Sequence, residues 1–197
     1  MTRLVVLASG TGTNLQAILD ASVDGRLPAS VAAVVSNKAG SGALQRAADA
    51  GVPYVHVAPH TGEPRADYDA RLADIVSGFD PDWVVLAGWM RVLSMSFLGW
   101  FPGMVVNLHP ALPGEFPGVD AVERAWHEAQ SGNRDHTGVM VHLVPNEGID
   151  DGPVLATATV PIHPSDTLES LTNRVHDVEH RVLVETLATL CTTGANA

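Results

Sequence analysis

The fold is decided by the stretch Leu4-Val5-Val6-Leu7-Ala8-Ser9-Gly10-Thr11-Gly12-Thr13-Asn14. Its five leading apolar residues predict a short strand of the kind that a parallel sheet buries on both faces. Leu15, Ile18 and Leu19 follow at helical spacing and predict a helix directly after the glycines. A strand, a glycine turn and a helix in this order form a cradle for an anion, because free backbone N–H groups face it.

Two better-known phosphate motifs do not fit this turn. A dinucleotide fingerprint would need a third glycine where Leu15 stands, and no Lys-Ser or Lys-Thr pair follows as a P-loop requires. The remaining interpretation is a site for a single phosphate at Gly12, Thr13 and Asn14, whose last two side chains can add hydrogen bonds. The alternative is an ordinary strand-to-helix turn.

Strands and helices alternate along the rest of the chain. This rhythm predicts an α/β fold with a doubly wound, mostly parallel sheet and a Rossmann-like N-terminal half. Asp120 and Asp166 are expected to cap two of the helices. The expected strands cover residues 31–35, 54–57, 83–87, 104–109, 138–144 and 154–160, and the expected helices cover 42–50, 65–79, 96–100, 120–128 and 166–190. A single domain over residues 1–197 accounts for the length.

A second stretch, Met104-Val105-Val106-Asn107-Leu108-His109-Pro110, is the strongest candidate for chemistry. Pro110 cannot continue a central strand, so Asn107 and His109 should lie at the carboxyl end, where open α/β sheets bind ligands. Two positions apart on a strand, both side chains point to the same side. An amide and an imidazole that converge suit a developing oxyanion or a proton transfer. The alternative is an Asn and a His that only end a strand.

Composition narrows the function classes. The formal net charge of −11 disfavours binding to nucleic acid, but leaves a small anionic substrate open. A lone Cys191 excludes a disulfide framework and fits a reducing compartment. No secretory signal and no membrane-spanning run is apparent. We therefore expect a cytoplasmic protein that acts on small molecules and binds no membrane.

Other polar clusters have ordinary explanations. Asp150 and Asp151 lie in a turn, where Asp is common, although an acid beside an imidazole could raise its pKa. His142 is expected to be an ordinary sheet histidine. His176 and His180 lie four apart on the last helix, but the zinc-protease pattern would place Glu directly after the first His. We therefore expect no metal.

Taken together, the motifs resemble the phosphoribosylglycinamide formyltransferases, a family of folate-dependent enzymes of de novo purine synthesis. The resemblance runs in family order from residue 3 to about residue 190. The matching stretches are Ser9-Gly10-Thr11-Gly12-Thr13-Asn14-Leu15-Gln16-Ala17, Val35-Ser36-Asn37-Lys38, Leu86-Ala87-Gly88-Trp89-Met90-Arg91, Asn107-Leu108-His109-Pro110 and Asp150-Asp151-Gly152-Pro153.

The resemblance implies a reaction and a role for each motif. The amine of glycinamide ribonucleotide would attack the formyl carbon of 10-formyltetrahydrofolate, the cosubstrate. Asn107 and His109 would stabilise the oxyanion, and Asp150 would hold His109 charged and help to move the amine proton. The substrate-binding residues would be Gly12, Thr13 and Asn14 at the phosphate and Glu179 on the last helix. The folate would contact Arg65, Met90, Arg91, Val92, Leu93, Asn107 and the loop from Glu147 to Asp150.

The resemblance also divides the predicted formyltransferase fold into two halves. Residues 1–100 or so would bind the phosphate, and about 101–190 would bind the folate and carry out the chemistry. Two alternatives stay open: a hydrolase that resembles formyltetrahydrofolate deformylase, and a nucleotide-binding module without catalysis. A methionyl-tRNA formyltransferase is disfavoured because this acidic chain does not suit tRNA. Whether the chain forms a homodimer is left open.

Overall fold

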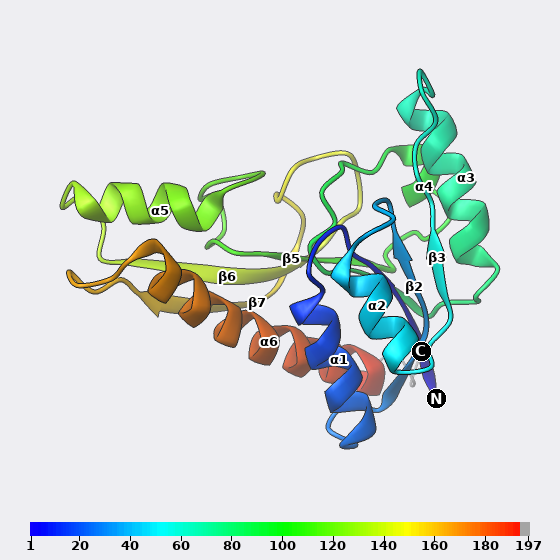
Figure 1. Cartoon of the computed structure of the whole chain (residues 1–197), viewed down its shortest axis with the longest axis horizontal. Helices are drawn as coiled ribbons and strands as arrows, with labels where there is room; N and C mark the ends of the chain where they lie inside the picture. Colours follow the sequence, from blue (N-terminus) through cyan, green and yellow to red (C-terminus); the bar gives the residue numbers. More distant parts are fainter. Residues whose placement is uncertain (194–197) are drawn as a thin grey trace.

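A seven-stranded sheet runs through the molecule in the order β3-β2-β1-β4-β5-β6-β7 (Figure 1). The computed structural model describes residues 1–193, so the last four residues of the predicted domain lie outside the described residues. The strands are β1 (Thr2–Leu7), β2 (Ala29–Ser36), β3 (Tyr54–His56), β4 (Trp83–Leu86), β5 (Val105–His109), β6 (His136–Leu143) and β7 (Val154–Pro161). The helices are α1 (Thr13–Val23), α2 (Gly42–Asp49), α3 (Arg65–Ser77), α4 (Met95–Leu98), α5 (Ala121–Gln130) and α6 (Leu168–Thr193).

The direction of the strands divides the sheet into two parts. β1 to β5 pair in parallel, whereas β6 pairs antiparallel with both β5 and β7. The prediction of an α/β, mostly parallel sheet with a Rossmann-like N-terminal half is therefore confirmed. The strand order reverses between β1 and β4, because the chain first builds outward to β3 and then returns to pair β4 with β1. Ligands bind at such a switch point, outside the carboxyl ends of the strands.

Helices cover both faces of the parallel part, as the continuously apolar β1 requires. Leu4 and Val6 of β1 belong to one buried cluster, with apolar residues of α1, α2, α5 and α6. Val5 and Leu7 belong to a second cluster, with residues of α3 and α4. Figure 1 shows α1 and α6 side by side on one face, while α3 and α4 lie together on the other. Alternate residues of one strand thus fix both layers of the fold.

Of the two predicted helix caps, Asp120 stands at the expected position without a capping hydrogen bond from its side chain, and Asp166 is wrong. Asp120 precedes α5 but has a left-handed backbone, φ 58°, and its side chain makes no capping hydrogen bond. A capping residue normally has an extended backbone that directs its oxygen to the helix. Before α6 the cap is Thr167, whose Oγ1 accepts a hydrogen bond from the Ser170 N–H at 3.1 Å, while the Ser170 Oγ accepts one from the Thr167 N–H at 3.0 Å. Asp166 instead binds the Arg174 guanidinium through two hydrogen bonds of 2.7 Å.

Candidate active site

A cavity of about 670 Å³ opens at the carboxyl ends of β1, β4 and β5. Its wall contains the turn after β1, the segment after β4, the end of β5 and the loop between β6 and β7. His176 and Glu179 of α6 close one side. The volume lies within the range of 300–1,000 Å³ or so that is usual for small-molecule sites. The cavity therefore lies where the switch point of the sheet predicts it.

Asn107, His109 and Asp150 come together at one end of this cavity. The amide nitrogen of Asn107 donates to Asp150 Oδ1 at 3.0 Å, and His109 Nδ1 lies 3.3 Å from Asp150 Oδ2. The backbone N–H of Gly118 donates to the same Oδ2 at 2.8 Å. The carboxylate of Asp150 is therefore the centre that fixes both β5 side chains, although it lies 43 residues from Asn107 in the sequence.

The turn that carries Asp150 has little freedom. Asp150 has a left-handed backbone, φ 54°, which Asp tolerates better than most residues. The base of the loop is closed by a hydrogen bond of 2.9 Å from the Leu143 N–H to the Pro153 carbonyl. A Cβ at Gly152 would overlap the carbonyl oxygen of Leu143, so glycine is required there. The Asp150-Asp151-Gly152-Pro153 motif thus holds one carboxylate over the end of β5.

Burial changes the acidity of the pair. It lowers the pKa of His109, and neither Asp150 nor the Glu115 carbonyl, which both act in the opposite direction, reverses this. Burial alone would raise the pKa of Asp150, but the neighbouring His142, Gly118 and His109 outweigh it and lower that pKa. These shifts favour a neutral His109 beside an ionised Asp150. This differs from the charged imidazole that the resemblance implies.

His142 is part of this cluster, although the sequence interpretation treated it as an ordinary sheet histidine. Its ring is only 2% exposed. Nδ1 lies 2.9 Å from the Leu143 carbonyl and so carries the proton, which leaves Nε2, 3.1 Å from the Asn107 amide nitrogen, to accept a hydrogen bond. The signal for this contact is the antiparallel register that pairs Asn107 with His142. The periodicity of the sequence does not contain that register.

The Asn107 amide is fully engaged in this arrangement. Its two hydrogens go to Asp150 Oδ1 and His142 Nε2. A substrate oxyanion would therefore have to replace one of these two partners in order to receive a hydrogen bond from Asn107.

The predicted phosphate turn follows β1, which β4 separates from β5 in the sheet, and so it lies at the other end of the cavity. Gly12 has a left-handed backbone, φ 77°, and stands at the N-cap position of α1. Gly10 to Asn14 all line the cavity. The backbone N–H groups of Gly10, Thr11 and Gly12 have no acceptor within the part of the chain that the structure describes. This is the geometry that an anion requires at a helix N-terminus.

Glu179 meets this turn from α6. The Asn14 amide nitrogen donates to Glu179 Oε2 at 3.4 Å, across 165 residues of sequence. His176 Nε2 lies 3.9 Å from the same oxygen. Glu179 is 6% exposed, and burial raises its pKa to about 7, although the hydrogen bond from Asn14 acts against the shift. A buried carboxylate with one long hydrogen bond retains capacity to accept bonds from a polyol.

The segment after β4 forms the wall between the two ends. Met90, Arg91, Val92 and Leu93 all line the cavity. The Met90 N–H donates to Ser9 Oγ at 3.0 Å, and the Arg91 guanidinium lies over the Tyr68 ring at 4.5 Å. These contacts fix the backbone of a segment that has no regular structure.

Apart from Glu147, Arg65 is the one predicted site residue that does not line the cavity. It begins α3 and forms an ion pair with Glu147 of the β6–β7 loop. Glu147 also accepts a hydrogen bond of 3.1 Å from the Met95 N–H. Arg65 therefore reaches the cavity only through the loop that borders it.

The described residues 1–193 contain no cluster of three metal-ligating side chains, and no helix among them is long and apolar enough to cross a membrane. His176 and His180 stack at 6.5 Å between ring centroids. Cys191, which the sequence places near the chain end, is buried against the core, and burial raises the pKa of its thiol.

Comparisons with known proteins agree with this geometry. The formyl transferase family matches residues 2–187. The chain is 42% identical over 204 residues to the phosphoribosylglycinamide formyltransferase of Schizosaccharomyces pombe, an alignment that covers 96% of this chain and 97% of that protein. It is 38% identical over 179 residues to the enzyme of that name in Escherichia coli, covering 91% of this chain and 82% of that protein.

Solved structures give the same result. The phosphoribosylglycinamide formyltransferase from Bacillus halodurans superposes with a TM-score of 0.91 at 36% identity, covering 98% of this chain and 97% of that one. A glycinamide ribonucleotide transformylase from Geobacillus kaustophilus has a TM-score of 0.89 at 40% identity, covering 96% and 98%. The chain therefore belongs to the formyl transferase family and groups with its phosphoribosylglycinamide formyltransferases, as its motifs predicted.

Proposed function

We propose that this chain transfers the formyl group of 10-formyltetrahydrofolate to the amine of 5'-phosphoribosylglycinamide. The products are 5'-phosphoribosyl-N-formylglycinamide and tetrahydrofolate, in de novo purine synthesis. One observation carries the proposal. A single cavity has an anion cradle at Gly12 to Asn14 and a cluster of Asn107, His109 and Asp150 at its other end. A substrate with a phosphate at one end and a reacting amine at the other matches this arrangement.

The residues support an acyl transfer in which the amine nitrogen bonds to the formyl carbon and the bond from that carbon to folate N10 breaks. His109, oriented by Asp150, would donate a hydrogen bond to the formyl oxygen as negative charge develops there. That charge favours the protonated imidazole and so acts against burial, which lowers the pKa of His109. Asp150 is ionised and accepts hydrogen bonds, so it can take up the proton that the amine loses. That proton is finally transferred to N10 of the departing folate.

The two substrates would occupy different walls. The phosphate would accept hydrogen bonds from the N–H groups of the turn at Gly12 to Asn14, and Glu179 would accept them from the ribose hydroxyls. The folate would lie along Met90 to Leu93 and under the loop from Glu147 to Asp150, with Arg65 supporting that loop through Glu147. We further propose a cytoplasmic location, which the single Cys191 favours.

A spectrophotometric assay with purified protein tests the proposal. Absorbance due to deformylated folate should grow only when the amine substrate and the 10-formylated folate are both present. Growth without the amine would contradict the transferase and indicate a hydrolase. Silence under both conditions would indicate a binding module without catalysis.

A further inference from the structure

Helix α2 holds the phosphate turn from the side opposite the cavity. The Ala43 N–H donates to the Gly10 carbonyl at 3.2 Å, and Arg46 Nε donates to the Thr11 carbonyl at 2.9 Å. The two segments touch without space for side chains between them. A Cβ on Gly12 would lie 2.7 Å from Ala43 Cα, and one on Gly42 would lie 2.6 Å from the Thr11 carbonyl oxygen. The turn therefore takes its shape from α2 as well as from its own glycines.

These contacts fix the direction of the N–H groups that would bind the phosphate. In a trans peptide the C=O and the next N–H point in opposite directions, and the chain has no cis peptide among its described residues. When α2 holds the carbonyls of Gly10 and Thr11, the N–H groups of Thr11 and Gly12 must point away from α2. Both residues line the cavity on that other side, and neither N–H has an acceptor among the described residues.

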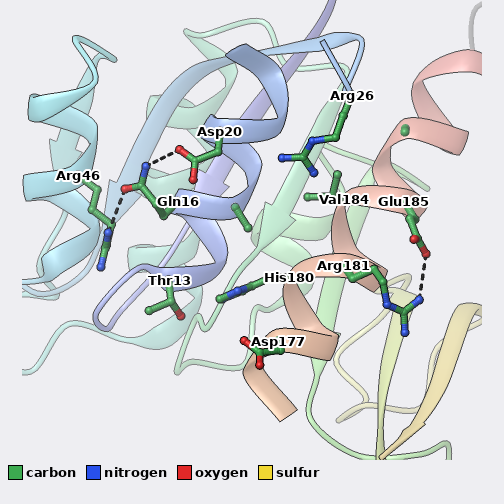
Figure 2. Close-up of a pocket in the computed structure, with 12 residues that line it drawn as sticks. Thr13, Gln16, Asp20, Arg26, Arg46, Asp177, His180, Arg181, Val184 and Glu185 are labelled. Carbon is green, nitrogen blue, oxygen red and sulfur yellow. Dashed lines mark hydrogen bonds and ion pairs between the residues drawn. The ribbon is translucent and has the colours of Figure 1, made fainter. Parts of the chain in front are cut away.

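Arg46 is itself held in place. Its Nη1 donates to Gln16 Oε1 at 2.9 Å, and the Gln16 amide nitrogen donates to Asp20 Oδ1 at 2.8 Å, which turns the amide oxygen toward the arginine. Figure 2 shows this chain of contacts from α2 to α1, at the edge of a second cavity of about 690 Å³ between α1 and α6. Arg46 thus joins the turn to the helix that follows it.

The charge of Arg46 is not neutralised nearby. The two other arginines in Figure 2, Arg26 and Arg181, form ion pairs with Asp24 and Glu185. Arg46 bonds to a backbone carbonyl and an amide, and the described residues offer it no carboxylate within ion-pair distance. The positive charge of the Arg46 guanidinium, which donates to the Thr11 carbonyl, also polarises the Thr11–Gly12 peptide. This polarisation makes the Gly12 N–H a stronger donor to an anion.

We propose that Arg46 is a positioning residue for the substrate phosphate, acting through the Thr11–Gly12 peptide and without touching the reacting atoms. The inference rests on the proposed function, because it assumes that the turn binds a phosphate. It predicts that removal of the Arg46 side chain lowers kcat/KM only for a substrate that carries the phosphate group.

The test compares two substrates in wild type and Arg46→Ala. One is 5'-phosphoribosylglycinamide and the other is the same molecule without its phosphate. The value of kcat/KM for the phosphorylated substrate should fall about tenfold, the size of one charge-assisted hydrogen bond, through KM rather than kcat. The value for the phosphate-free substrate and the KM for folate should stay within a factor of two or so of wild type.

The controls separate position from fold. Gln45→Ala removes an α2 side chain whose only hydrogen bond among the described residues goes to Asp49, 2.8 Å away on the same helix, and it should change neither substrate's kinetics. Gln16→Ala keeps the Arg46 guanidinium but removes one of its hydrogen-bond acceptors. It should therefore lower kcat/KM less than Arg46→Ala does, and only for the phosphorylated substrate. Gln16→Ala carries the test if Arg46→Ala does not fold. Equal losses on both substrates, or none, would overturn the inference.

A titration with inorganic phosphate separates this inference from the proposed function. Arg46→Ala should bind phosphate about tenfold more weakly than wild type. Wild type that binds phosphate but does not formylate the amine would contradict the proposed function and leave the inference standing. Equal phosphate affinity in the two proteins would overturn the inference.

Discussion

At one end of the cavity, Gly12, Thr13 and Asn14 are consecutive residues, and at the other, Asn107, His142 and Asp150 come from two strands and a loop. The phosphate turn itself is built from a strand, two glycines and a helix within about twenty residues of sequence, and α2 then holds its carbonyls in place. The catalytic cluster needs the antiparallel pairing of β5 with β6 and a loop that brings Asp150 back over both strands. Substitutions in the phosphate turn, which is a local site, should therefore change the affinity for the phosphate group. Substitutions in the catalytic cluster, which is assembled from distant segments, should change the rate of the reaction.

The largest expected effect is at His109. His109→Ala should lower kcat by on the order of a hundredfold or more, because a donor to the oxyanion is lost. KM for the phosphorylated substrate should change little, since the phosphate turn is intact. His127→Ala is a matched control, because His127 also lies beside a carboxylate, Glu123 at 3.7 Å, but on the exposed face of α5. Steady-state kinetics on both variants would refute the assignment if His109→Ala retained near-normal kcat while remaining folded.

Asp150→Asn should lower kcat by a comparable factor, on the order of a hundredfold, since the proton acceptor and the partner of His109 are both lost. It should also shift the pH profile. Asp150 raises the pKa of His109 against the effect of burial, so its neutralisation lets that pKa fall further. The limb of the kcat/KM profile that reports His109 should therefore move to lower pH. An unchanged limb would break the pairing inferred from the 3.3 Å contact.

Glu179 offers a test through stability. The folded-state pKa of Glu179, about 7, lies above its ordinary value of 4.5. The stabilisation that the protonated Glu179 contributes to the free energy of unfolding is therefore fully present below pH 4.5 and is lost as pH rises through about 7. The shift corresponds to about 3 kcal/mol. Relative to Glu179→Gln, wild type should therefore lose about that much free energy of unfolding between pH 4.5 and pH 8. Urea titrations at both pH values measure it, and parallel pH dependence in the two proteins would show that Glu179 is not buried as a carboxylate.

Sequence periodicity predicted the features that depend on neighbouring residues. The strand–turn–helix at Leu4 to Asn14 and the common side of Asn107 and His109 follow from local pattern alone. Asp150 was assigned through the family resemblance, since a turn of Asp and Gly has many ordinary explanations. His142 was missed because its role depends on the register between β5 and β6. The cap of α6 was placed one residue early because Asp166 and Thr167 are both good capping residues, and only the Arg174 contact decides between them.

The smallest effect is expected in the phosphate turn, where it tests most directly whether the turn and the catalytic cluster act independently. Asn14→Ala removes a side chain that donates to Glu179 and could also reach the phosphate, so affinity for 5'-phosphoribosylglycinamide should fall about tenfold in a calorimetric titration. At saturating substrate, kcat should stay within a factor of about three, because Asn107, His109 and Asp150 are untouched. Asn173→Ala, on the exposed side of α6, serves as the control and should bind like wild type. If Asn14→Ala lowered kcat as strongly as affinity, the two ends of the cavity would be coupled, and the separation between a local binding site and an assembled catalytic site would be refuted.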